Sequence, residues 1–300
     1  FHIRISLSLL FSLCFSFTPF VSYRVLGHYI YTPLYIFPLV FLLFYAFCEN
    51  KKREKKLLFS FLFGSLMAFI LMLNLYYFVT ILLGFFFYSL YYGIWQRKVL
   101  FQFLQKHFSY LLFSFFVSFF FLLPWFSATV NLLQFEGLVK TPGFGGAITL
   151  SADILTFVTP SEYNPFYHYL ISSLGDISDI FRKYKNFYLS AWDGFAYPGI
   201  LLLVGYPLFI FFRKKLPFSL QKMTTSHLFV SVLFASLLFG PFLKVFRRFV
   251  FYLEDVGVVI PLPFIILHYI PGLSSIRAPT RFMPAFVFLA VFMVSLFWEH

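Results

Sequence analysis

The sequence has 300 residues, of which 61% are hydrophobic, 25% aromatic and only 11% charged. Soluble domains carry about 25% charged residues, so a chain with less than half that density cannot cover a water-facing surface. Together with a mean hydropathy of +0.85, this composition excludes a disordered chain, a nucleic-acid-binding module and a soluble enzyme of ordinary design. It indicates an integral membrane protein. The net charge of +12 then reflects topology, because Lys and Arg collect in cytoplasmic loops.

Uncharged apolar runs of nearly membrane-spanning length recur along the chain. A bilayer core of about 30 Å requires roughly 20 apolar residues in a helix. The runs are residues 5–20, 29–48, 57–73, 76–94, 110–126, 197–212, 228–243 and 282–298. The sequence therefore predicts an all-α fold, a polytopic bundle of about eight membrane-spanning helices. Only Asn74-Leu75 separates the third run from the fourth, which predicts a tight turn, since one continuous helix would overshoot a bilayer.

The basic residues of the short loops predict the orientation of these spans. Lys and Arg cluster in residues 49–56, around Arg97 and around Lys214, and such clusters favour the cytoplasmic side. The extracytoplasmic side then holds two longer connections with short interfacial helices. The expected segments are 1–126 with helices 1–5, the outer loop region 127–196, 197–243 with helices 6 and 7, the outer-face loop 244–281, and 282–300 with the last helix.

The second outer loop begins with cations that fit an outer position poorly. Lys244, Arg247 and Arg248 alternate with aromatic residues as far as Glu254. This pattern predicts an amphipathic helix in the headgroup plane, with its cations facing phosphates. The apolar, proline-interrupted stretch 256–268 follows. We expect it to line a lateral groove for a prenyl chain, because irregular backbone at membrane depth is tolerated only against protein or a cavity.

The densest polar stretch is residues 271–282, where Arg277 and Arg281 flank Pro279 just before the last span. Two interpretations are open: the guanidinium groups bind a lipid phosphate or diphosphate, or they only extend to lipid headgroups. Pro279 disfavours helical geometry at Ala278, which predicts an extended segment there. No motif of a soluble enzyme and no metal-ligand spacing is present. The near absence of ionisable groups from the spans disfavours an ion-coupled transporter.

Four further residues are candidates for the same surface. Asp153 and Glu162 lie in the polar stretch 151–165; each could act as a general base or, alternatively, cap a helix or hold a loop. His28 and His268 lie at the outer ends of apolar stretches. They are candidate ligands of a lipid phosphate or, alternatively, histidines with a structural role at the interface.

The run Pro-Gly-Leu-Ser-Ser-Ile-Arg-Ala-Pro-Thr-Arg-Phe at 271–282 resembles the late signature of bacterial YfhO-like proteins, of the GT-C glycosyltransferase superfamily. Residues 17–28, 151–165 and 197–199 resemble the same family more loosely. The resemblance implies a multi-pass enzyme of the bacterial cytoplasmic membrane. Such an enzyme takes a sugar from a polyprenyl-phosphate carrier and transfers it on the extracytoplasmic face. Arg277, Arg281 and His28 are the residues that match the motifs.

The resemblance also implies a catalytic acid on the first outer loop, but residues 21–28 contain no Asp or Glu. We therefore expect this acid upstream of Phe1, with the chain forming the C-terminal part of a longer protein. The expected partners are membrane lipids and the polyprenyl-phosphate-linked sugar, without nucleic acid. No cofactor, donor sugar or acceptor is indicated. Two alternatives stay open: a transporter or flippase of a lipid-linked glycan, and a non-catalytic membrane scaffold.

Overall fold

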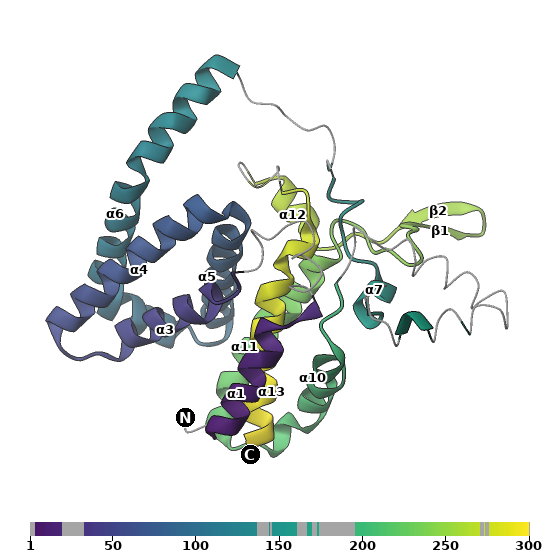
Figure 1. Cartoon of the computed structure of the whole chain (residues 1–300), viewed down its shortest axis with the longest axis horizontal. Coiled ribbons are helices and arrows are strands. Elements are labelled where there is room, and N and C mark those ends of the chain that lie inside the picture. Colours follow the sequence, from purple (N-terminus) through teal and green to yellow (C-terminus); the bar gives the residue numbers. More distant parts are fainter. Residues whose placement is uncertain are drawn as a thin grey trace. The chain divides into compact units, whose positions relative to one another are not determined.

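The computed structural model describes residues 4–19, 33–136, 144, 146–160, 167–169, 173, 196–270, 273 and 276–299. Helices dominate this part of the chain, as the sequence predicts, with one short β-hairpin (Figure 1). The chain divides into two compact units. Unit 1 comprises Phe1–Tyr29 and Thr141–His300, and unit 2 comprises Ile30–Lys140. This division differs from the expected linear segments, because the first helix belongs with the C-terminal helices.

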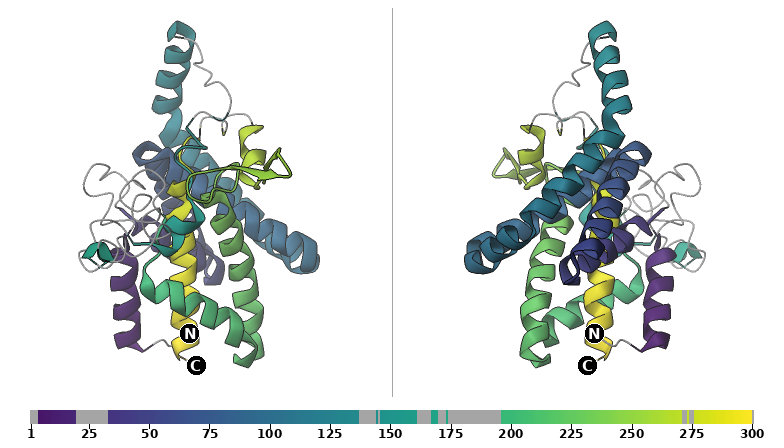
Figure 2. Two further views of the ribbon diagram at one scale, coloured as in Figure 1. Left: turned by 90° about the vertical axis from the view of Figure 1, so that its right-hand side faces the viewer. Right: turned by 90° about the vertical axis from the view of Figure 1, so that its left-hand side faces the viewer.

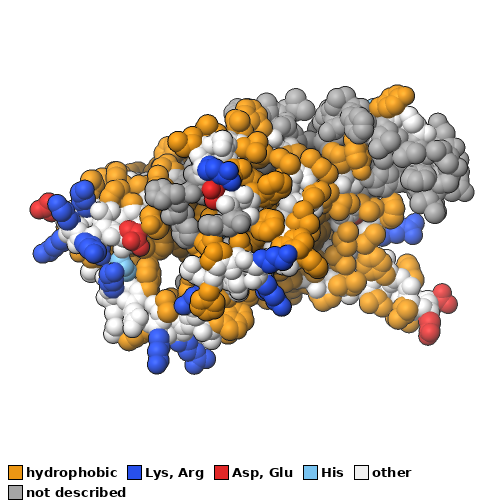
Figure 3. Space-filling model, turned by 90° about the horizontal axis from the view of Figure 1, so that it is seen from below, with side chains coloured by type: hydrophobic (Ala, Val, Ile, Leu, Met, Phe, Trp, Pro, Cys, Tyr) orange, Lys and Arg blue, Asp and Glu red, His pale blue; other side chains and the backbone are white. Residues whose placement is uncertain are grey.

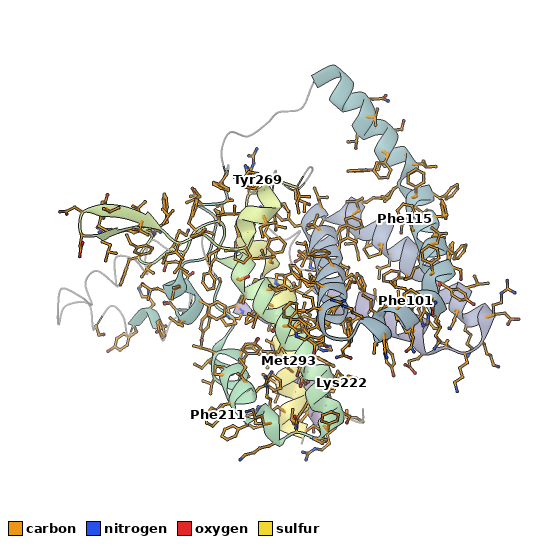
Figure 4. The ribbon with its side chains drawn as sticks, turned by 180° about the vertical axis from the view of Figure 1, so that it is seen from behind. Phe101, Phe115, Phe211, Lys222, Tyr269 and Met293 are labelled. Carbon is orange, nitrogen blue, oxygen red and sulfur yellow. The ribbon has the colours of Figure 1, made fainter. Side chains whose placement is uncertain are left out.

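The central helix of unit 1 is α13 (Met283–Glu299). It contacts α1 (Ile5–Ser16), α10 (Ile200–Phe212) and α11 (Phe218–Leu238), which lie beside it in both views of Figure 2. Met293, in the middle of α13, is fully buried among these helices (Figure 4). An apolar helix surrounded in this way is buried on most sides, so α13 forms the core of unit 1.

Side-chain pairs give the direction of each helix relative to α13. α1 is antiparallel, because Arg4 at its start pairs with Glu299 at the end of α13 (Nε to Oε1, 3.3 Å). Ring pairs show that α11 is antiparallel and α10 parallel: His227–Phe292, Phe234–Phe282, Tyr206–Phe286 and Phe209–Phe297. The basic 3-10 turn η2 (Arg213–Lys215) therefore lies at the same end of unit 1 as Arg4. The start of α13 lies at the opposite end, as the predicted orientation requires of this unit.

The described residues of unit 2 form four successive helices: α3 (Ile36–Glu49), α4 (Arg53–Leu73), α5 (Leu75–Trp95) and α6 (Arg97–Glu136). The predicted tight turn between α4 and α5 is confirmed. Asn74 caps α5, and its Oδ1 atom accepts hydrogen bonds from the backbone N–H groups of Tyr76 and Tyr77 (3.0 and 3.3 Å). Asparagine at this position satisfies donors that a helix start leaves open.

Small residues bring α4 and α6 into close parallel contact. Ser114 Oγ donates to the carbonyl of Ser60 (2.9 Å), and Ser118 Oγ donates to the carbonyl of Gly64 (2.6 Å). A Cβ atom at Gly64 would lie only 2.4 Å from the carbonyl oxygen of Ser114. Membrane helices associate through such small residues and interhelical hydrogen bonds. Because α4 and α6 are parallel, the basic loops that precede them lie at one end of unit 2.

Four of the described helices are long and apolar enough to cross a membrane: Arg53–Leu73, Leu75–Trp95, Arg97–Asn131 and Pro279–Glu299. They coincide with the predicted spans 57–73, 76–94, 110–126 and 282–298. The other four predicted spans also overlap helices, but α1, α3 and α10 have only 12, 14 and 13 residues. The protein is therefore a helical protein with candidate membrane spans, and the count of eight stays a prediction.

The surface agrees with a lipid environment. Hydrophobic side chains cover much of the described surface in Figure 3, and Lys and Arg gather in separate groups. On α6, Phe101 and Phe115 extend away from the helix (Figure 4), and each is 62% exposed. Large apolar patches of this kind mark membrane or protein contacts.

α6 is also longer than predicted. It continues past Phe126 to Glu136, because no glycine or proline lies between Pro124 and Gly137 to stop it.

The predicted amphipathic helix at 244–254 is wrong. Val245 and Arg248 form an antiparallel bridge, with Phe246 and Arg247 in the left-handed region at φ 49° and 64°. The turn leads into the antiparallel hairpin of β1 (Val250–Leu253) and β2 (Val256–Val259). Aromatic and β-branched residues favour strands, and here this preference prevails over the helical spacing of the cations.

The hairpin turn is the second reason that no helix forms. Glu254 and Asp255 connect β1 to β2 at φ 48° and 64°, the conformation that two-residue hairpin turns require. The stretch expected to line a groove is divided between β2 and the short helix α12 (Phe264–His268). The prenyl groove itself stays a prediction.

Candidate functional site

Segments far apart in the sequence meet at a turn formed by residues 146–153 of unit 1. Lys244 Nζ donates to the carbonyl of Ile148 (2.9 Å), and Thr280 Oγ1 donates to the carbonyl of Leu150 (3.3 Å). The 146–153 turn thereby holds both the second outer loop and the start of the last span. All of these contacts lie within unit 1, at the end where α13 begins.

Lys244 is a buried cation, with only 7% of its surface exposed. Its ammonium also donates to the carbonyl of Thr149 (3.2 Å), in addition to that of Ile148. A buried charge is tolerated only where hydrogen bonds replace those to water. These carbonyls provide part of that replacement, so Lys244 has partners within the protein. We therefore assign it a structural role and exclude it from the candidate ligands.

Asp153 is 3% exposed and caps α7 (Ile154–Val158), as one of its two interpretations predicts. Its Oδ1 atom accepts a hydrogen bond from Leu155 N (2.9 Å), and its Oδ2 atom accepts one from Arg247 N (2.7 Å). Burial raises the pKa of the Asp153 carboxyl. Backbone donors, among them Arg247, and the charge of Lys244 oppose this rise. Both carboxylate oxygens hold the backbone, so the geometry favours a structural role over that of a general base.

Replacing Asp153 with alanine should destabilise unit 1 by about 1–3 kcal/mol, because a helix cap and a charge-assisted hydrogen bond are lost. Asp153→Asn keeps one acceptor oxygen and should therefore lose only part of this stability. Thermal unfolding in detergent micelles measures both effects. The control is Glu54→Ala, which removes an exposed carboxylate of unit 2. Unchanged unfolding of Asp153→Ala would contradict the structural role.

Arg277 and Arg281 lie on one short segment at the start of α13. Arg277 is exposed and Arg281 is half-buried. Ala278 has φ −124° and ψ 86°, so the prediction of a non-helical residue before Pro279 is confirmed. A 3-10 turn, η3 (Pro279–Phe282), then leads into the helix. A helix start carries a partial positive charge and unpaired N–H donors, so this segment favours an anion.

The 146–153 turn and the neighbouring Phe144 also contact two of the candidates. A Cβ atom at Gly146 would lie 3.6 Å from Arg277 Cβ. The ring of His268, which is half-buried at the end of α12, lies 4.7 Å from the ring of Phe144. Asp153, His268 and Arg277 therefore all lie in or beside one stretch of chain. His28 and Glu162 lie outside the described residues. The described residues contain no group of three His, Cys, Asp or Glu that could hold a metal ion.

Sequence reasoning missed Gly240, which joins α11 to this site. Gly240 has φ +73°, and a Cβ atom there would lie 2.4 Å from Ser151 Cβ. A signal was present, because glycine followed by proline after an apolar helix is typical of a helix end.

Comparisons with protein-family models, curated proteins and solved structures found no match to this chain.

Proposed function

We propose that this chain is part of a multi-pass membrane glycosyltransferase of the GT-C type that uses a polyprenyl-phosphate-linked sugar on the extracytoplasmic face. Arg277 and Arg281 hold the lipid phosphate. The observation that supports this most is the position of Arg277: exposed, on a proline-stiffened segment, at the head of the candidate span Pro279–Glu299. The phosphate group of a polyprenyl carrier, whose prenyl tail is embedded in the membrane, lies at this level of a bilayer.

The segment offers a phosphate more than one positive charge, because directed donors and a helix dipole are added to it. Each guanidinium presents a planar fork of donors that matches phosphate oxygens. The start of α13 adds the positive end of a helix dipole. The hydrogen bond from Thr280 to Leu150 and the close approach of Gly146 to Arg277 support the backbone of this segment, so little backbone order is lost on binding.

The catalytic acid is not assigned to Asp153 in this proposal. Its carboxylate is buried and bonded to the backbone N–H groups of Leu155 and Arg247. The proposal therefore gives this chain the binding of the carrier phosphate and does not use Asp153 as the acid.

Arg277→Ala should weaken binding of a polyprenyl-phosphate sugar roughly tenfold or more. A charge-assisted hydrogen bond contributes about 1.5–3 kcal/mol, and every 1.4 kcal/mol is about tenfold in affinity. Arg281→Ala should act in the same direction, and Arg277→Lys should restore binding only in part because the planar fork is lost. Binding and sugar transfer are measured with the complete protein in nanodiscs.

The matched control is Arg213→Ala, which removes a cation from the opposite end of unit 1. If Arg277→Ala and Arg281→Ala bind the carrier as the unmodified protein does, the arginines contact headgroups only and the proposed site is wrong. If binding is weakened but the unmodified protein moves the lipid-linked sugar across the bilayer without transferring it, the protein is a flippase.

A further inference from the structure

The β1–β2 hairpin exposes an almost entirely apolar surface. Tyr252, Leu253 and Val256 are 78%, 71% and 63% exposed, and neighbouring valines on β2 are exposed as well. Apart from Gly257, every residue of the two strands is aliphatic or aromatic. An isolated two-stranded hairpin is marginally stable in water, and exposed apolar patches mark surfaces that are covered in use.

The strand register gives the hairpin two different faces. Phe251 pairs with Val258 and Leu253 pairs with Val256, and directly opposed residues project to the same face. The side chains of this first face are wholly hydrocarbon. The opposite face carries Tyr252 across from Gly257 and Val250 across from Val259. This face is therefore apolar near the base of the hairpin, and the phenol group of Tyr252 is its polar group.

The hairpin is placed at the level of a membrane surface. It extends from the end of unit 1 at which α13 begins, and it lies crosswise to α13 in the views of Figures 1 and 2. Since α13 belongs to a candidate membrane span, an element lying across its end runs along the bilayer plane. Arg247 and Arg248, both exposed, stand at the base of the hairpin, where lipid phosphates would meet them.

We propose that the hairpin is an interfacial anchor that lies in the outer leaflet, at the boundary between headgroups and acyl chains. The face of Phe251, Leu253, Val256 and Val258 contacts the acyl chains. Tyr252 lies among the headgroups, where tyrosine is enriched, and the two arginines bind lipid phosphates.

The charges favour this lipid partner and this orientation. Glu254 and Asp255 are exposed at the tip, and carboxylates are costly in hydrocarbon. The hairpin therefore lies along the surface and does not insert tip first. The proposal does not depend on sugar transfer, because it concerns only the contact between hairpin and bilayer.

Spin labels at single cysteines test the proposal in the complete protein, reconstituted in vesicles of phosphatidylethanolamine and phosphatidylglycerol. Cys14 and Cys48 are first replaced by alanine, and labels are placed at Leu253→Cys, Val256→Cys and, as the water-exposed control, Glu254→Cys. Accessibility to oxygen, which concentrates in acyl chains, is compared with accessibility to a polar nickel complex.

The expected result is an oxygen-to-nickel accessibility ratio several-fold higher at positions 253 and 256 than at position 254. Because all three side chains are exposed, the substitutions leave the core intact, and normal elution of the reconstituted protein confirms folding. Equal ratios at the three positions would overturn the proposal. So would labels at 253 and 256 that are shielded from both reagents, since a protein partner or a second copy of this chain would then cover the hairpin.

Discussion

Gly64→Ala should lower the stability of unit 2 by about 2–4 kcal/mol. The added Cβ atom would lie 2.4 Å from the carbonyl oxygen of Ser114, so α4 and α6 must separate. Overpacking a tight contact costs about 1–3 kcal/mol, and the hydrogen bonds from Ser114 and Ser118 would lengthen as well. Each such bond between membrane helices contributes about 0.6 kcal/mol. Thermal unfolding of the protein in micelles measures the loss.

Gly93→Ala is the matched control for this substitution. Gly93 lies in α5 of the same unit, and a Cβ atom there would meet only Leu100 Cδ2, at an ordinary 3.7 Å. Alanine also favours a helix over glycine, so Gly93→Ala should be neutral or slightly stabilising. Equal effects of the two substitutions would mean that the close contact of α4 and α6 does not limit the stability of unit 2.

Gly240→Ala should destabilise unit 1 by about 2–5 kcal/mol for two separate reasons. The left-handed conformation at φ +73° costs a non-glycine residue roughly 1–2 kcal/mol. In addition, the new Cβ atom would lie 2.4 Å from Ser151 Cβ, and overpacking adds about 1–3 kcal/mol. The 146–153 turn would then shift, and the backbone that supports Arg277 would shift with it. Thermal unfolding and carrier binding should therefore both be impaired.

Two further variants separate the conformational effect from the steric effect. Gly199 also has a positive φ, +98° with ψ 151°, a conformation that is essentially restricted to glycine, but a Cβ atom there would be 3.5 Å from Pro19. Gly199→Ala should therefore show a conformational cost without a steric clash. Ser151→Gly removes the Cβ atom that Gly240→Ala would strike, so the double variant should recover part of the stability. If the double variant loses as much stability as the two single variants added together, the clash between the Cβ atom added at residue 240 and Ser151 Cβ does not cause the destabilisation.

Proximity along the chain decided which sequence predictions succeeded. The turn at Asn74, the non-helical residue before Pro279 and the cap at Asp153 each depend on atoms a few residues apart. Propensities and side-chain hydrogen bonds act at that range. The 244–254 segment is the exception. Its cations have helical spacing, but its aromatic and β-branched residues favour strands, and tight turns at 246–247 and 254–255 reverse the chain. Local rules conflicted there, and the spacing of the cations was the weaker signal.

The sequence alone determined that this is a helical protein with apolar helices long enough to cross a membrane, because composition and run length follow directly from solvation in lipid. Only the tertiary structure decided which helices pack together and which polar groups meet. The bonds from Ser114 to Ser60, from Lys244 to Ile148 and from Thr280 to Leu150 join residues 54, 96 and 130 positions apart. Runs of similar apolar residues do not specify such pairings, because almost any two apolar helices can bury the same area against each other. Individual glycines, serines and one buried lysine select the arrangement, and their partners become visible only once the chain is folded.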